Sequence, residues 1–277
     1  MIDSKLLGWV QSPSGGARLQ LRDGFLRNGK WQDGTVLLIP PGSREFEVSE
    51  FKRPNDAVIN DAGFAVIADW LSLDKPLPQG ELCFLAPDGT VYRRCRLDQN
   101  LACLAMDPEG RLVFVTTAAS EYHHPKLMCF SVSTGELLWD MAAPKPASEI
   151  TVVGEEQCIH IGRPYHVPDC DFLLKVTYEG RVIEKCPASP YEALSWAEAE
   201  RQEGRFSIAG RWYRVAAEAD IAAPYRAKAY RGLGELAEDD ERPKEALNLY
   251  ERALTLDANV GVKRKIQLLR RLHRNEL

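Results

Sequence analysis

Imidazole, thiolate and carboxylate side chains gather in one short stretch of this chain, between residues 160 and 171. The candidate metal ligands are His160, His166, Asp169 and Cys170. These are ligand types that Zn²⁺ takes in proteins. Their spacing fits no zinc finger or ribbon, however, and His160 stands between two isoleucines in an expected strand. A histidine held in the core or at a sheet edge is therefore the favoured interpretation, and we expect no cofactor.

Signatures of other chemistry are missing from the sequence. It contains no Gly-x-Ser-x-Gly elbow for a nucleophilic serine, no P-loop and no Gly-x-Gly-x-x-Gly that follows a strand. No catalytic residue is assigned, and we favour a protein without enzyme activity. The alternative is a small-molecule or metal-dependent propeller enzyme or sensor that uses the loop region between His160 and Asp171.

Composition narrows the class of protein. The chain has 277 residues, 45% of them hydrophobic, which argues against disorder and for about two domains. A net charge of −5 argues against nucleic acid as a partner. There is no apolar run of about 20 residues, so we expect no membrane partner and a cytoplasmic location. Seven cysteines without a Cys-x-x-Cys pair fit reduced thiols rather than a disulfide framework.

Glycines recur at nearly constant spacing over the first part of the chain. Gaps of 47, 46 and 45 residues separate Gly42, Gly89, Gly135 and Gly180. A second set keeps step with gaps of 47, 47 and 44 residues: Gly16, Gly63, Gly110 and Gly154. A period in the forties is typical of a repeat architecture.

Strand-like segments flank each glycine of both sets. Asp88-Gly89, Thr134-Gly135 and Glu179-Gly180 supply a residue that tolerates positive φ in a tight hairpin. Two hairpins per repeat make four strands per repeat, which is the size of a β-propeller blade. The alternative is an irregular β-sandwich in which the turn glycines are coincidental.

One hairpin carries a family resemblance. The segment from Lys126 to Trp139 resembles the strand–Thr-Gly–strand–Trp hairpin of quinoprotein-like (PQQ-type) β-propellers, whereas the marks of WD40 blades are absent. In other repeats Trp139 is replaced by Arg93 or Glu184. The expected fold for residues 1–188 is a β-propeller-like array of about four four-stranded blades. Such an array is closed, open, or completed by self-association with a second chain.

The sequence pattern of residues 189–277 favours helices. The segment 227–260 resembles a tetratricopeptide repeat, with Tyr230, Leu233 and Gly234 on its first helix. A looser copy precedes it, in which residues 204–215 form either a helix or a hairpin about Gly210. Residues 262–273 have the apolar spacing of an amphipathic helix that caps the array.

The tetratricopeptide resemblance implies a groove lined by the first helix of each repeat. The residues placed there are Tyr191, Leu194, Glu198, Arg201, Lys228, Arg231 and Glu235. The alternative is that the helices only pack on the β-domain. We therefore favour a non-enzymatic interaction or scaffold protein that binds another protein or a peptide through the propeller loops, the helical groove, or both.

Overall fold

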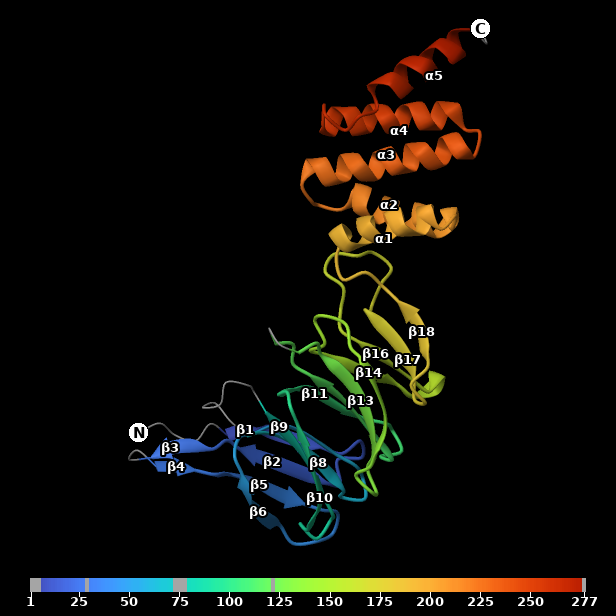
Figure 1. Cartoon of the computed structure of the whole chain (residues 1–277). Helices are drawn as coiled ribbons and strands as arrows, with labels where there is room; N and C mark the ends of the chain where they lie inside the picture. The colour runs from blue at the N-terminus through green and yellow to red at the C-terminus, as the bar shows by residue number, and fades with distance from the viewer. Residues whose placement is uncertain (1–5, 28–29, 72–78, 121–122, 276–277) are drawn as a thin grey trace. The chain divides into compact units, whose positions relative to one another are not determined.

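The computed structural model describes residues 6–27, 30–71, 79–120 and 123–275. Contacts divide the chain into two compact units (Figure 1). The β-unit comprises Met1–Gly162 and Phe172–Lys185, and the helical unit comprises Arg163–Asp171 and Cys186–Leu277. The division that the sequence suggests after residue 188 stays a prediction. None of the described helices is long and apolar enough to span a bilayer.

Four antiparallel sheets of four strands make up the β-unit, each a meander in sequence order. The first contains β1 (Leu6–Gln11), β2 (Arg18–Arg22), β5 (Gly34–Ile39) and β6 (Phe46–Phe51), with the separate hairpin β3 (Phe25–Arg27) and β4 (Lys30–Gln32) inserted after β2. The second contains β7 (Pro54–Ile59), β8 (Ala65–Trp70), β9 (Gly80–Leu85) and β10 (Val91–Leu97). The third contains β11 (Leu101–Met106), β12 (Leu112–Thr117), β13 (Lys126–Ser131) and β14 (Leu137–Ala142). The fourth contains β15 (Ile150–Val153), β16 (Cys158–Ile161), β17 (Leu174–Thr177) and β18 (Val182–Lys185).

Apolar layers lie between consecutive sheets. The layers between the first and second, second and third, and third and fourth sheets include the pairs Leu38 and Ile67, Phe84 and Phe130, and Phe114 and Tyr178. The first strands β1, β7, β11 and β15 lie next to one another in turn. The described residues form no such layer between the fourth and first sheets. The predicted propeller-like array of four four-stranded blades is confirmed.

Hairpin glycines are the points where each sheet meets the one before it. A methyl group on Gly180 would lie 2.9 Å from Cδ2 of Trp139 in the third sheet. The corresponding contacts are Gly135 with Arg93 and Gly89 with Phe46, and all three glycines have φ between +67° and +85°. All three positions favour glycine for its φ, and at Gly135 and Gly180 the close approach also leaves no room for a Cβ.

The first glycine of this set differs in its surroundings. Gly42 has φ +63°, but among the described residues nothing lies within 4 Å of where its Cβ would be. Within the described part of the chain, this hairpin therefore makes no close approach of the kind seen at Gly89, Gly135 and Gly180.

Five helices form the rest of the helical unit. They are α1 (Pro190–Gln202), α2 (Phe206–Glu218), α3 (Ala223–Asp239), α4 (Pro243–Leu256) and α5 (Lys263–Asn275). Each packs against the next. Residues 206–215 are helical because Ala209, Trp212, Tyr213 and Ala216 recur at helical spacing and are buried. The hairpin alternative is therefore wrong, and the predicted C-terminal helix is confirmed.

Glycines also set the distances between helices. A methyl group on Gly232 of α3 would lie 2.4 Å from the ring of Tyr213 on α2. One on Gly234 would lie 2.6 Å from the ring of Tyr250 on α4. Each tyrosine ring thus rests directly on the backbone of α3, which lets α2 and α4 approach that helix from two sides.

Our first prediction compares Gly180→Ala with Gly42→Ala. Both variants force a side chain into a left-handed backbone, which costs about 1–2 kcal/mol. Only Gly180→Ala also pushes a methyl group into Trp139, which adds about 1–3 kcal/mol. Urea unfolding followed by circular dichroism should therefore show the larger loss for Gly180→Ala. Equal losses would contradict the role given to this contact.

A second pair of variants should have opposite signs. Gly210 in α2 has room for a methyl group, whose nearest neighbour would be Leu236 at 3.5 Å. Gly210→Ala should raise the free energy of unfolding by about 0.5–1 kcal/mol because alanine favours the helix. Gly232→Ala should lower it by about 1–3 kcal/mol, since the Tyr213 ring must move. Thermal and urea unfolding of both variants test this, and a stabilised Gly232→Ala protein would refute the packing argument.

Candidate functional site

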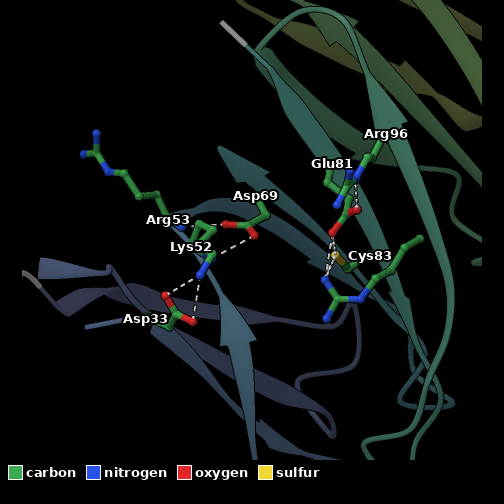
Figure 2. A network of polar contacts seen from close by, with 8 residues as sticks. Asp33, Lys52, Arg53, Asp69, Glu81, Cys83 and Arg96 are labelled. Carbon is green, nitrogen blue, oxygen red and sulfur yellow. Dashed lines mark hydrogen bonds and ion pairs between the residues drawn. The ribbon is translucent and has the colours of Figure 1, made fainter. Parts of the chain in front are cut away.

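A polar cluster with buried carboxylates lies where the first and second sheets of the β-unit join (Figure 2). Asp69, at the end of β8, is buried, and its two carboxylate oxygens accept the backbone N–H groups of Lys52 and Arg53 at 2.9 and 2.6 Å. The Lys52 ammonium extends to Asp33, 2.8 Å away. The Arg53 guanidinium pairs with Asp23. Asp69 thereby holds the link between β6 and β7.

Glu81 stands beside Asp69 on β9, in direct register with it. Its carboxylate receives Arg94 at 2.7 Å and Arg96 at 3.4 Å, and Arg94 also donates to the Cys83 sulfur at 3.4 Å. Burial raises the pKa of the Cys83 thiol far above its ordinary value, so the reactive thiolate is absent near neutral pH. Every carboxylate oxygen of this buried pair has a donor. We interpret the cluster as a structural joint rather than a reacting centre.

A similar joint connects the second and third sheets. Asp56 on β7 is partly buried, and its carboxylate accepts the backbone N–H of Leu104 on β11 at 3.0 Å. The indole N–H of Trp70 donates to the carbonyl of Leu101 at 3.1 Å. Repetition at successive joints supports the structural interpretation, because a catalytic cluster would stand at one place only.

The residues predicted as metal ligands are divided between the two units. His160 belongs to β16, and its ring centre lies 4.5 Å from that of Phe172. His166, Asp169 and Cys170 lie in the segment 163–171 of the helical unit, where the Cys170 sulfur accepts from Arg211 at 3.9 Å. Within the described ranges, no three His, Cys, Asp or Glu side chains are placed to hold a metal ion.

Three of the seven side chains predicted to line a helical groove pair with one another. Leu194 is buried, and Arg201 of α1 forms an ion pair with Glu235 of α3. Arg231 lies 3.7 Å from the same carboxylate and donates to the carbonyl of Val260. These charges are used within the fold, which leaves them less available to a ligand.

The other residues predicted to line the helical groove are Tyr191, Lys228 and Glu198. Tyr191 is exposed and meets Tyr225 edge to face at 4.9 Å, with the Lys228 ammonium 5.7 Å from the Tyr225 ring. Glu198 is exposed on α1.

Ser189 caps the start of α1 by accepting the N–H of Glu192, and Pro190 suits the first helical position.

Ion pairing continues to the last helix. Lys265 of α5 donates to Glu238 of α3, which also receives the hydroxyl of Tyr250. Burial opposes the charged form of Glu238, but these two hydrogen bonds outweigh it and hold the pKa of that carboxyl below its usual value. This cluster ties α3, α4 and α5 together on one side of the helical unit.

A groove opens elsewhere in the helical unit, across α2, α3 and α4. It has a volume of about 460 Å³. It is lined by Phe206, Ser207, Gly210, Arg214, Ala217, Glu218, Tyr230, Leu233, Leu236, Asp240, Arg242, Glu245, Leu249 and Arg252. None of the residues predicted for a helical groove is among them. We call this feature the α2–α4 groove.

The α2–α4 groove has an apolar floor and a charged rim. Tyr230, Leu233, Leu236 and Leu249 are buried or half-buried, whereas the arginines and carboxylates of the lining are exposed. The lining contains neither histidine nor cysteine. It therefore offers shape, apolar surface and charge for binding, but no histidine or thiol that could act as base or nucleophile.

Sequence reasoning missed this groove for a specific reason. Its lining combines side chains of three helices, including Tyr230 and Leu233, whereas the tetratricopeptide resemblance places a groove on residues of α1 and α3 outside this lining. The signal that was present is the small Gly210 followed one turn later by Arg214. A glycine in a helix interior often has a packing or functional reason.

The joint at Asp69 yields a third prediction. Burial raises the pKa of Asp69 above its ordinary value of 3.8, against the opposing hydrogen bonds from Lys52 and Arg53. The folded protein thus binds this proton more tightly than the unfolded chain. The contribution of Asp69 to the free energy of unfolding is therefore greatest below about pH 4 and falls as pH rises through the folded-state pKa.

The Asp69→Asn substitution removes the titrating carboxyl group of Asp69. Urea unfolding across the acid range should show the stability difference between the original protein and the variant shrinking as pH rises. Asp140→Asn, at an exposed carboxylate of β14, is the matched control. A difference that is flat, or that grows with pH, would show that Asp69 is not the buried titrating group.

Comparison with known proteins gives a fold and no family. No protein-family model matches the chain, and no curated protein sequence matches it. Among solved structures, the β-propeller domain of the trilobed protease from Pyrococcus furiosus, described as having an open velcro topology, matches with a TM-score of 0.46 and 9% identity. The match covers 66% of this chain and 58% of that one.

A second solved structure is acylaminoacyl peptidase from Pyrococcus horikoshii. It matches with a TM-score of 0.41 and 8% identity, over 67% of this chain and 33% of that one. The chain thus spans less than two thirds of either neighbour. Both neighbours are peptidase structures, and this finding contradicts the hypothesis of a non-enzymatic interaction or scaffold protein, which we withdraw. The chain is similar to these proteins in the fold of its sheets.

Proposed function

We propose that this chain has a peptidase-like function in peptide processing, in which the α2–α4 groove holds a short peptide as substrate. The observation that carries the proposal is the groove itself, with its apolar floor and charged rim. One solved neighbour is a domain of a protease and the other is a peptidase, but the argument rests on the groove.

The dimensions and lining of the α2–α4 groove suit a short peptide. Its volume of about 460 Å³ lies within the range of small-ligand sites. Leu233, Leu236 and Leu249 offer apolar surface to ligand side chains. The guanidinium and carboxylate groups of the rim can hydrogen-bond peptide carbonyl and N–H groups. A peptide presents both kinds of surface in alternation.

From its lining residues, we assign to the groove the binding of the substrate. Ser207 is the lining's aliphatic hydroxyl, and no lining histidine stands ready to activate it. The groove would therefore hold and orient the substrate, while the bond is cleaved by groups outside the lining. Binding of the peptide and cleavage of the peptide can therefore be measured separately.

The finer family resemblances belong to the same proposal. Two features favour a tetratricopeptide-type helical unit: helices that pack in sequence order, and the close contacts of Gly232 with Tyr213 and Gly234 with Tyr250. The resemblance of the sheets to quinoprotein-like blades is supported by the Trp139 hairpin, whose indole N–H donates to the Tyr178 carbonyl at 2.8 Å.

Blocking the groove provides the test. Ser207 is exposed at the rim, so Ser207→Trp should fill the groove without disturbing the core. Fluorescence anisotropy with a short fluorescein-labelled peptide that contains leucine and glutamate should show binding weakened about tenfold or more, which corresponds to about 1.4 kcal/mol. Ser195→Trp, on the exposed surface of α1 and outside the lining, should bind like the original protein.

Mass spectrometry of the same peptide after incubation separates the two steps. Cleavage by the purified chain would establish peptidase activity directly, and binding without cleavage would assign the chain to substrate binding alone. Peptide binding that is absent, or that Ser207→Trp and Ser195→Trp affect equally, would overturn the proposal.

A further inference from the structure

The rim of the α2–α4 groove carries three arginines and three carboxylates, and the arginines differ in how they are paired. Arg242 is committed to two carboxylates, Asp240 at 2.7 Å and Glu245 at 2.6 Å. Arg214 and Arg252 form no ion pair with any carboxylate of the described chain. The chain as a whole has a net charge of −5, but these two guanidinium groups on the groove are not neutralised by a carboxylate of the described residues.

Both of these guanidinium groups are held in place by another contact. The Nε–H of Arg214 donates to the carbonyl of Gly210, 3.1 Å away on its own helix, and its terminal nitrogens have no hydrogen-bond partner among the described residues. The guanidinium of Arg252 lies over the ring of Tyr230, with its carbon 5.7 Å from the ring centre. A guanidinium that is already oriented loses less conformational freedom when it binds a ligand.

The rim also carries a limit on ligand charge. Glu218 lies one helical turn after Arg214, lines the same groove and forms no ion pair within the described residues. A second negative charge on the ligand would meet this carboxylate. The lining therefore favours a ligand with one anionic group next to apolar side chains.

We infer that the α2–α4 groove recognises a carboxylate of its peptide through Arg214 and Arg252, an inference that rests on the function proposed above. A guanidinium presents two parallel N–H donors that match the two oxygens of a carboxylate. The carboxylate has two possible sources, the free C-terminus of the peptide and an aspartate or glutamate side chain. The leucine-rich floor takes the neighbouring apolar residues.

The test uses labelled leucine-containing peptides in matched forms. One pair differs by a free or amidated C-terminus, and the other by glutamate or glutamine. Neutralising the recognised carboxylate should weaken binding about tenfold, and the pair that shows the loss identifies its source. Arg214→Gln and Arg252→Gln should each cause a loss of similar size for the charged peptide and little change for its neutral form.

Arg264→Gln is the matched control, because it removes the same charge from an exposed position on α5 outside the groove. Circular dichroism of each variant checks that the helices are intact. If peptides bind with equal affinity in all four forms, the groove binds peptide but carboxylate recognition is wrong. If no form binds, the proposed function fails together with this inference.

Discussion

The close approach of a hairpin glycine to the sheet before it is the constraint on which the β-unit depends. Gly89, Gly135 and Gly180 each meet a side chain of the outer strand of the preceding sheet; a Cβ would clash at Gly135 and Gly180 and would be tightly packed at Gly89. The spacing of about 46 residues follows, because each sheet needs one such point at the same place in its meander. Apolar layers then form between consecutive sheets, and buried carboxylates such as Asp69 and Asp56 fix the linking backbone.

The same principle operates in the helical unit with a different consequence. Tyr213 and Tyr250 rest on Gly232 and Gly234, so α2 and α4 both lie close to α3. The space that remains across these three helices is the α2–α4 groove. Several charges elsewhere in this unit are paired, as in the cluster of Lys265, Glu238 and Tyr250.

The sequence predicts the elements well and the site poorly. Turn glycines report a local need for positive φ, so the eight-glycine period located all four sheets. The conformation of residues 206–215 was ambiguous, because aromatic and β-branched residues such as Trp212 and Val215 favour strands locally. Burial of Trp212 and Tyr213 against the neighbouring helices decides for a helix. The pairing of Asp69 with Glu81 depends on the register of β8 and β9, which no single segment encodes.

Hydrogen exchange with mass spectrometry, on the full chain with and without the labelled leucine- and carboxylate-bearing peptide, tests the central claim most directly. The account predicts that the peptide slows exchange in α2, in the second half of α3 and in α4, and leaves the β-sheets unchanged. Protection confined to the loops of the β-unit, or to the Tyr191 and Tyr225 end of α1 and α3, would contradict it.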